Sequence, residues 1–233
     1  MKHLLKKVLP NPLIRVAQKV IGVSKQRKKP LLTLYSGEDS SVLQCCIAYN
    51  KYGGFCIPLA SHHRPAAQKV LSGKVYEQET IDYIVRNVAR GGDIIHAGTY
   101  FGDFLPALSR ACTDGGKVWA FEPNPENYRC ATITKSINHL KNVELTNAGL
   151  GSKKGTLYMR VLDEGGRALG GASHFVGAEI ENNHQLSEVE IVKVDDAVAS
   201  NRQVSILQLD VEGFEKSALM GLQMGVGPSQ ASE

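Results

Sequence analysis

From residue 93 onward, short apolar runs alternate with segments that have the spacing of amphipathic helices. Neighbouring parallel strands need a long crossover between them, and that crossover is usually a helix. The alternation therefore predicts an α/β fold, with a parallel sheet covered by helices on both faces. Five strands are expected, together with a segment at 155–161 that turns back beside the third; the five are residues 93–98, 117–122, 142–150, 188–194 and 204–211. The last is nearly all apolar, like a strand buried on both faces.

The helices between these strands are predicted from their first residues and from the spacing of their apolar side chains. We expect them at 76–90, 103–112 and 124–140. Asn124 is a favourable N-cap for the third helix, and Pro125 is a favourable first residue. The helical period turns two sets of side chains inward: Ile81, Ile84, Val85 and Val88 in the first helix, and Ile133, Ile137 and Leu140 in the third. A polar, glycine-rich loop is expected over 163–187.

Ahead of residue 93, two apolar runs around residues 50–54 predict a hairpin, and a short helix with Pro65 near its start follows. The chain is accordingly divided into four parts. They are a basic N-terminal arm (1–30), a hairpin and helix extension (31–75), the α/β domain (76–222) and a short tail (223–233).

Charge is distributed unevenly along the 233 residues. The chain has 27 Lys and Arg against 23 Asp and Glu, and residues 1–29 hold nine of these bases and no acid. The rest of the chain is net acidic, so we expect no nucleic-acid partner for the α/β domain. The basic arm is either a solvated extension or a segment that makes weak contact with a membrane surface.

Several other features bear on location and metal binding. No apolar stretch reaches the roughly 18 residues that a membrane-spanning helix needs. Basic side chains interrupt any apolar segment of a signal peptide, so a cytoplasmic location is expected. The five cysteines contain no C-x-x-C pair, and we expect no metal site from them.

The turn "HAGTYFGDF", residues 96–104, lies where a ligand approaches the carboxyl end of a strand. A dinucleotide fingerprint would continue from Gly98 with two more glycines, but Tyr100 and Asp103 stand at those positions. Pyrophosphate seeks free N–H groups at a helix N-terminus, where the Asp103 carboxylate would repel it. S-adenosylmethionine carries no phosphate and has a positive sulfonium, so the turn favours this cofactor.

Glu122 ends the second predicted strand, 24 residues after Gly98. An acid about 20 residues beyond the glycine turn is the residue expected to hydrogen-bond ribose hydroxyls. The alternative is a solvated acid at the start of the following helix, where carboxylates are favoured.

Three motifs together resemble the FkbM-type family of S-adenosylmethionine-dependent O-methyltransferases: "HAGTYFGDF", "FEPNPENY" and "LQLDVEGFE". The resemblance covers about residues 75–222 and implies a Rossmann-like class I methyltransferase fold for the α/β domain. It also implies a set of cofactor contacts. These are Gly98, Thr99 and Gly102 at the turn, Glu122 on the ribose, Asn124 and Asn147 or Ala148 around the adenine, and Glu77 near the cofactor.

The sequence departs from the family pattern at three places. His96 stands where the family usually has Asp; its imidazole is either satisfied by neighbouring backbone or, as a neutral ring, bonded to the methionine end of the cofactor. Gln208 stands where the family often has Lys. The sequence also stops soon after residue 222, so we expect a truncated product that lacks the C-terminal strands. Residues 204–211 would then form an apolar edge open to self-association.

Asp210 and Glu212 follow the fourth strand of the family pattern, beside the expected position of the methyl group. Asp210 is the first candidate for a general base or for an anchor of the substrate hydroxyl, and Glu212 is the second. Alternatively, these acids cap the helix that begins near Gly213. They could also hold a divalent cation, but no third ligand is evident.

The sequence thus predicts a methyltransferase that uses S-adenosylmethionine to methylate a hydroxyl of a small molecule or sugar. Two alternatives stay open. One is a methyltransferase-like binding module without catalysis, which His96 and the short C-terminus favour. The other is an NAD(P)-dependent oxidoreductase, which Asp103 and the missing third glycine disfavour.

Overall fold

The computed structural model describes residues 42–176 and 186–222, so the basic arm and the tail lie outside the described residues. Four strands form one parallel sheet in the order β10-β3-β4-β5. They are β3 (Asp93–Ala97), β4 (Val118–Phe121), β5 (Val143–Thr146) and β10 (Val204–Leu209). The predicted α/β fold with a parallel sheet is confirmed.

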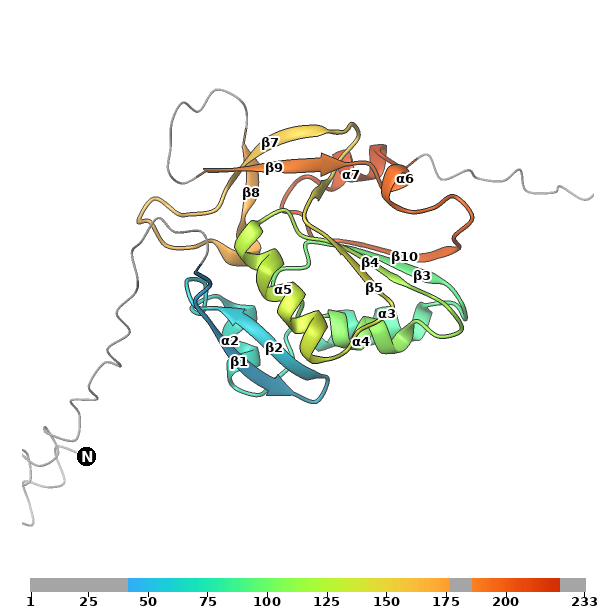
Figure 1. The fold of residues 1–233 in the computed structure, drawn as a ribbon, viewed down its shortest axis with the longest axis horizontal. Coiled ribbons are helices and arrows are strands. Elements are labelled where there is room, and N and C mark those ends of the chain that lie inside the picture. Colours follow the sequence, from blue (N-terminus) through green and yellow to red (C-terminus); the bar gives the residue numbers. More distant parts are fainter. Residues whose placement is uncertain (1–41, 177–185, 223–233) are drawn as a thin grey trace, which may run out of the picture. The chain divides into compact units, whose positions relative to one another are not determined.

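Helices cover this sheet on both faces, as predicted (Figure 1). On one face, β3 and β4 share a core with α3 (Gln78–Asn87), α4 (Leu105–Ala111) and α5 (Pro125–Ile137). On the other face, they pack with α6 (Val194–Ala197) and α7 (Glu215–Met220). The neighbours Ile94 and Ile95 belong to different cores because successive side chains of a strand point to opposite faces.

The prediction that residues 204–211 are buried on both faces is wrong. Every residue of β10 is only partly buried, and within the described residues the strand pairs with β3 alone. The strand is apolar because Val204, Leu207 and Leu209 pack against the core under α6 and α7. The strand lies at the edge of the sheet, as expected for residues 204–211. Self-association through this edge stays a prediction.

The expected strand 142–150 is in fact two strands that belong to different sheets. After β5 the chain leaves the parallel sheet at Asn147, whose Nδ2 donates to the backbone oxygen of Glu122 at 2.8 Å. It then forms β6 (Gly149–Leu150) in a second sheet with β7 (Gly155–Arg160), β8 (His174–Val176) and β9 (Leu186–Val192), in the order β6-β9-β7-β8. The segment at 155–161 therefore pairs with β9 and β8, and not with the third strand.

The segment 163–187, expected to be a loop, contains regular secondary structure that its polar composition did not predict. A backbone bridge joins Leu162 to Ala168, and a short 3₁₀ helix, Gly170–Ala172, leads into β8. Residues 177–185 lie outside the described residues. The described part of this loop forms a wall of the candidate site, discussed below.

The predicted hairpin is formed by β1 (Cys45–Asn50) and β2 (Gly53–Pro58), followed by α2 (Pro65–Leu71). Its second strand packs on α5: the Thr134 hydroxyl accepts from the backbone N–H of Cys56 at 3.0 Å and donates to the Phe101 carbonyl at 2.8 Å. The buried face of α5 therefore includes Cys130, Ala131 and Thr134.

Two predicted inward positions are wrong. Ile137 in α5 is 40% exposed, and Val85 in α3 is also 40% exposed. Ile81, Ile84 and Leu140 are buried as predicted. Within the described residues, no helix combines the length and apolar character needed to cross a membrane.

A buried ion pair joins the start of β3 to the chain just before β10. Asp93 is fully buried and accepts from the Lys117 backbone N–H at 2.8 Å, from Trp119 Nε1 at 2.7 Å and from Arg202 Nε at 2.7 Å. Burial raises the pKa of Asp93, but the hydrogen bonds from Arg202 and Trp119 outweigh it and hold the pKa below its usual value.

We expect Asp93→Ala to lower the free energy of unfolding by about 3 kcal/mol, because it leaves Arg202 without its buried partner. Chemical denaturation measures this loss. The matched control is Arg90→Ala, which removes the exposed Arg90–Asp114 pair and should unfold close to wild type. Because the folded pKa of Asp93 is depressed, its stabilisation is present above the unfolded value of about 3.9 and is lost as pH falls. Equal losses in the two variants would contradict this account.

Candidate active site

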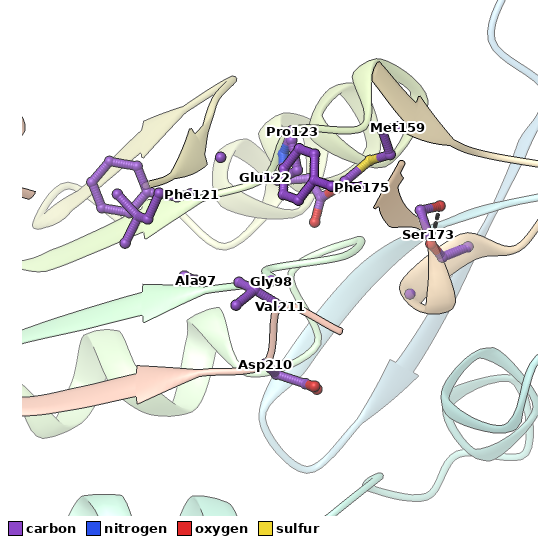
Figure 2. Close-up of a pocket in the computed structure, with 14 residues that line it drawn as sticks. Ala97, Gly98, Phe121, Glu122, Pro123, Met159, Ser173, Phe175, Asp210 and Val211 are labelled. Atoms are coloured by element: carbon purple, nitrogen blue, oxygen red, sulfur yellow. Dashed lines mark hydrogen bonds between the residues drawn. The ribbon is translucent and has the colours of Figure 1, made fainter. Parts of the chain in front are cut away.

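Two neighbouring pockets lie at the carboxyl ends of β3, β4 and β10, and both include Gly98, Gly171 and Asp210 in their linings. The narrow pocket, with a cavity volume of about 30 Å³, lies beside Glu122 (Figure 2). It is lined by Ala97, Gly98, Phe121, Glu122, Pro123, Gly149, Leu150, Met159, Gly170, Gly171, Ser173, Phe175, Asp210 and Val211. The acidic pocket, about 400 Å³, lies beside His96. It is lined by Arg64, Pro65, Ala66, Tyr76, Glu77, His96, Gly98, Tyr100, Asp103, Phe104, Gly171, Ala172, Gln208, Asp210 and Glu212.

Gly98 brings the first strand–helix turn against the exit of β10. Its φ is +83°, and a Cβ placed on it would lie 1.8 Å from the carbonyl oxygen of Asp210. The two segments are tied on each side of this approach, since the Asp210 N–H donates to Ala97 at 3.0 Å and the Gly98 N–H donates to Phe121 at 3.0 Å. A side chain would fill this space, so the turn requires glycine.

Glu122 is 4% exposed at the carboxyl end of β4, so the alternative of a solvated acid does not hold. One carboxylate oxygen accepts from the Tyr100 N–H at 2.7 Å, and the other accepts from the Asn124 N–H at 2.9 Å and from Asn127 Nδ2 at 3.4 Å. Burial raises the pKa of Glu122 to about 7 despite these hydrogen bonds. A carboxylate offers about four lone-pair positions, so Glu122 can still accept from a ligand hydroxyl.

The wall opposite Gly98 comes from β7 and from the segment 170–175, which the sequence predicted to be part of a polar loop. Figure 2 shows Met159, Ser173 and Phe175 beside Glu122, across the pocket from Gly98 and Asp210. Asn124 Nδ2 donates to the Ser173 hydroxyl at 3.3 Å, and Asn127 Nδ2 donates to the Gly170 carbonyl at 3.2 Å. These bonds hold the loop over the pocket and explain why the cavity is narrow.

The sequence signal for this wall is a glycine pair, Gly170 and Gly171, and Gly170 has φ +57° with Tyr100 Oη 2.7 Å from where its Cβ would lie. The same loop contains a second pair, Gly165 and Gly166, and a Cβ on Gly166 would meet open space, so the sequence does not tell which pair lies against the site. The pair at 170–171 indicates a close approach, but the sequence does not tell which segment approaches. Met159, Ser173 and Phe175 carry no comparable signal.

Some predicted cofactor residues hold the turn together and do not line either pocket. The Thr99 hydroxyl donates to the His96 carbonyl at 3.3 Å, and Gly102 packs against Leu105. Asn124 is the N-cap of α5, as predicted, and accepts from the Glu126 N–H at 3.0 Å. The Asn147 amide is bonded to the Glu122 and Pro123 carbonyls. Their contacts with a cofactor stay predictions, whereas Gly98, Glu122, Glu77 and His96 do line the pockets.

His96 lies opposite Gln208 in the pairing of β3 with β10, and its Nδ1 is hydrogen-bonded to Gln208 Oε1. The imidazole stacks on Phe104 with ring centroids 5.5 Å apart. Burial lowers the pKa of His96 to about 4, more than the bond to Gln208 raises it. The ring is therefore neutral near pH 7, with its proton on Nδ1 and a lone pair on Nε2. Nε2 has no hydrogen-bond partner among the described residues.

The acids after β10 do not cap the next helix. The α7 N-terminus has no side-chain cap, and the nearby Gly213 N–H donates instead to Glu215 at 3.1 Å. Asp210 and Glu212 line the acidic pocket together with Glu77 and Asp103. Partial burial raises the pKa of Asp210, and repulsion by Glu212 and Glu77 raises it further. No cluster of three or more metal-ligating side chains occurs in the part of the chain that the structure describes.

The narrow pocket suits an uncharged adenosine better than a pyrophosphate. No Lys or Arg is among its lining residues within the described chain, and Glu122 would repel a phosphate. Asp103, just ahead of α4, adds a further carboxyl near the turn, and burial raises its pKa to about 7. The Gly98 approach and the buried Glu122 therefore fit the adenosyl half of S-adenosylmethionine, provided that the 170–175 wall moves outward.

Comparison with known proteins agrees with this geometry. A family model described as the methyltransferase FkbM domain matches residues 96–230, more than half of the chain. This segment includes the glycine turn, Glu122 and the acids after β10. No curated protein matches the chain.

Two solved structures are also similar to the chain. The methyltransferase FkbM of Methylobacillus flagellatus is 15% identical with a TM-score of 0.38, over 60% of this chain and 35% of that one. A SAM-dependent methyltransferase of Aquifex aeolicus is 24% identical with a TM-score of 0.30, over 43% of this chain and 49% of that one. The matched part is less than half of either solved chain. Membership of the family therefore rests on the match to the family model.

We expect Gly98→Ala to lower the free energy of unfolding by more than about 3 kcal/mol, because it combines a left-handed backbone with a clash against Asp210. Thermal and chemical denaturation measure the loss. The matched control is Gly166→Ala, at φ +74° with open space around its Cβ, where only the backbone penalty of about 1 kcal/mol applies. A Gly98→Ala variant no less stable than the control would show that the close approach is absent.

Proposed function

Because the chain belongs to the family of methyltransferase FkbM domains, we propose that it transfers a methyl group from S-adenosylmethionine to a hydroxyl of a small molecule or sugar. The observation that carries the proposal is Glu122. Within the described residues, this buried carboxylate accepts hydrogen bonds from neutral donors, and about one of its four lone-pair positions stays free beside a glycine turn that a side chain would block. A ribose with two adjacent hydroxyls satisfies such a carboxylate.

S-adenosylmethionine supplies a methyl group on a positively charged sulfur. The chain's own residues orient the two substrates. Gly98 and Asp210 line both pockets, so the junction between the pockets is where the methyl group would lie. Residues 170 and 171 and the aromatic rings of the acidic pocket border this junction and would limit the access of water once both substrates are bound. The chain thus contributes orientation and a dry surface to the reaction.

A hydroxyl that attacks a methyl group must lose its proton, and we assign the acceptance of that proton to Asp210. Partial burial raises the pKa of this carboxyl, and repulsion by Glu212 adds to the effect. A raised pKa makes the Asp210 carboxylate a stronger base than an ordinary aspartate. Glu212 is the second candidate, since it lines the same pocket.

Two other functions are weighed against this one. An NAD(P)-dependent oxidoreductase would need a site for pyrophosphate, and the acids around Gly98 disfavour it. A binding module without catalysis is favoured by the neutral His96–Gln208 pair, which offers no charge to the cofactor. The methyl acceptor, the cytoplasmic location and the role of the basic arm stay predictions.

We expect isothermal titration to show micromolar binding of S-adenosylmethionine and of its demethylated product, S-adenosylhomocysteine. Glu122→Gln should weaken both by about tenfold or more, because hydrogen bonds to a charged group contribute about 1.5–3 kcal/mol. The control is Glu126→Gln, which replaces a carboxyl in the first turn of α5, outside the narrow pocket, and should bind like wild type.

NADH serves as the second ligand in the same titration and should not bind. Binding of NADH without S-adenosylhomocysteine would contradict the proposal and favour the oxidoreductase. Tight binding of S-adenosylmethionine without methyl transfer to any hydroxyl compound would favour the binding module. Methyl transfer that Asp210→Asn reduces by about 10²-fold or more, with cofactor affinity retained, would support the assigned base.

A further inference from the structure

The acidic pocket holds more negative charge than the proposed cofactor can neutralise. Its carboxylates come from three loops: Glu77 before α3, Asp103 before α4, and Asp210 with Glu212 after β10. Arg64 is the only cationic side chain among the described residues of its lining. S-adenosylmethionine has one sulfonium, one ammonium and one carboxylate, so its net charge is plus one. Two uncompensated negative charges would remain if all four acids were ionised.

Uncompensated negative charge in a partly closed pocket is unfavourable, and it raises the pKa of the carboxyls there. Burial raises the pKa of Asp103 to about 7, and the nearby charges of Glu77 and Asp210 raise it further. A second cation in the pocket would relieve this repulsion and return the proton to solvent.

An independent observation also points to a ligand with a hydrogen-bond donor. His96 is 2% exposed, lines the pocket, and has no partner for Nε2 among the described residues. Because its Nδ1 donates to Gln208, Nε2 is an acceptor. A buried acceptor without a partner is unfavourable, so a donor from a bound molecule would satisfy it.

The rest of the lining suits an ammonium group as well. Tyr76, Tyr100 and Phe104 contribute aromatic rings to the pocket. The Tyr100 hydroxyl is already bonded to Ser61 at 2.6 Å, so its ring is held in place. Aromatic faces attract cations, and carboxylates with a neutral imidazole offer only acceptors.

We propose that the acidic pocket recognises a methyl acceptor that carries a protonated amine close to the hydroxyl that is methylated. The inference rests on the proposed function, because it concerns the second substrate of the same reaction. A protonated amine has no lone pair and cannot attack a methyl group. The acids therefore hold the amine as a recognition group, and the hydroxyl is left as the nucleophile.

The test uses matched probes that differ in one substituent, a protonated amine in one and a neutral group in the other. Glucosamine is compared with glucose, and 2-aminocyclohexanol with 2-methylcyclohexanol, on full-length protein saturated with S-adenosylhomocysteine. Ligand-detected NMR measures each dissociation constant up to about 10 mM. We expect the amine of at least one pair to bind about tenfold or more tightly than its neutral partner.

Variants assign the preference to the acidic pocket. In the double variant Glu77→Gln with Glu212→Gln, the preference for the amine should fall to within about twofold. Glu79→Gln removes an exposed charge from the same helix outside the pocket and should keep the full preference. Circular dichroism melting of each variant confirms that it is folded.

Failure of this inference is separable from failure of the proposed function. The inference is overturned if S-adenosylhomocysteine binds while both neutral probes bind as tightly as the amines, or while no amine binds. It is also overturned if the amine preference survives in the double variant. Loss of S-adenosylhomocysteine binding by folded wild type overturns the proposed function itself, and the inference with it.

Discussion

The close approach of the Gly98 turn to the exit of β10 is the constraint on which the site depends. It exists because Gly98 has no side chain and adopts a left-handed backbone conformation. The approach lets β3 and β10 end side by side, so that the narrow pocket opens toward Glu122 and the acidic pocket toward His96. It also places Asp210 between the two pockets. A reaction that joins a nucleoside-bearing cofactor to a separate acceptor requires such a shared wall.

Charge distinguishes the two pockets and follows from a few residues. Glu122 is a single buried carboxyl held by backbone N–H groups, which suits the hydroxyls of a neutral sugar. The acidic pocket combines four carboxyls with a neutral His96–Gln208 pair, at positions where the family usually has Asp and often has Lys. The neutral pair keeps the interior of the sheet free of a buried charge, which would be costly there. The charge lies instead on loops at the rim, where it can meet a mobile ligand.

The parts that could be predicted from sequence are those fixed by local physics. The parallel strands, the Asn124 cap and the Gly98 turn follow from apolar spacing, capping chemistry and glycine placement over a few residues. The errors come from long-range contacts. The contact of Thr134 with the hairpin strand β2 sets the buried face of α5, and Ile137 stays 40% exposed at the edge of that contact, next to Gly54. The strand at 142–150 divides because the Asn147 amide binds the Glu122 carbonyl. The wall at 170–175 could not be foreseen, since its partners Asn124 and Asn127 lie far away in sequence.

The central claim is that Glu122 and the acidic pocket bind the two ends of one S-adenosyl cofactor. The most direct measurement is an experimental structure of the protein with S-adenosylhomocysteine bound. The account predicts both ribose hydroxyls within hydrogen-bond distance of the Glu122 carboxylate, the 170–175 wall moved outward, and the homocysteine end directed past Gly98 into the acidic pocket. A ligand bound elsewhere, or a ribose with no contact to Glu122, would contradict it.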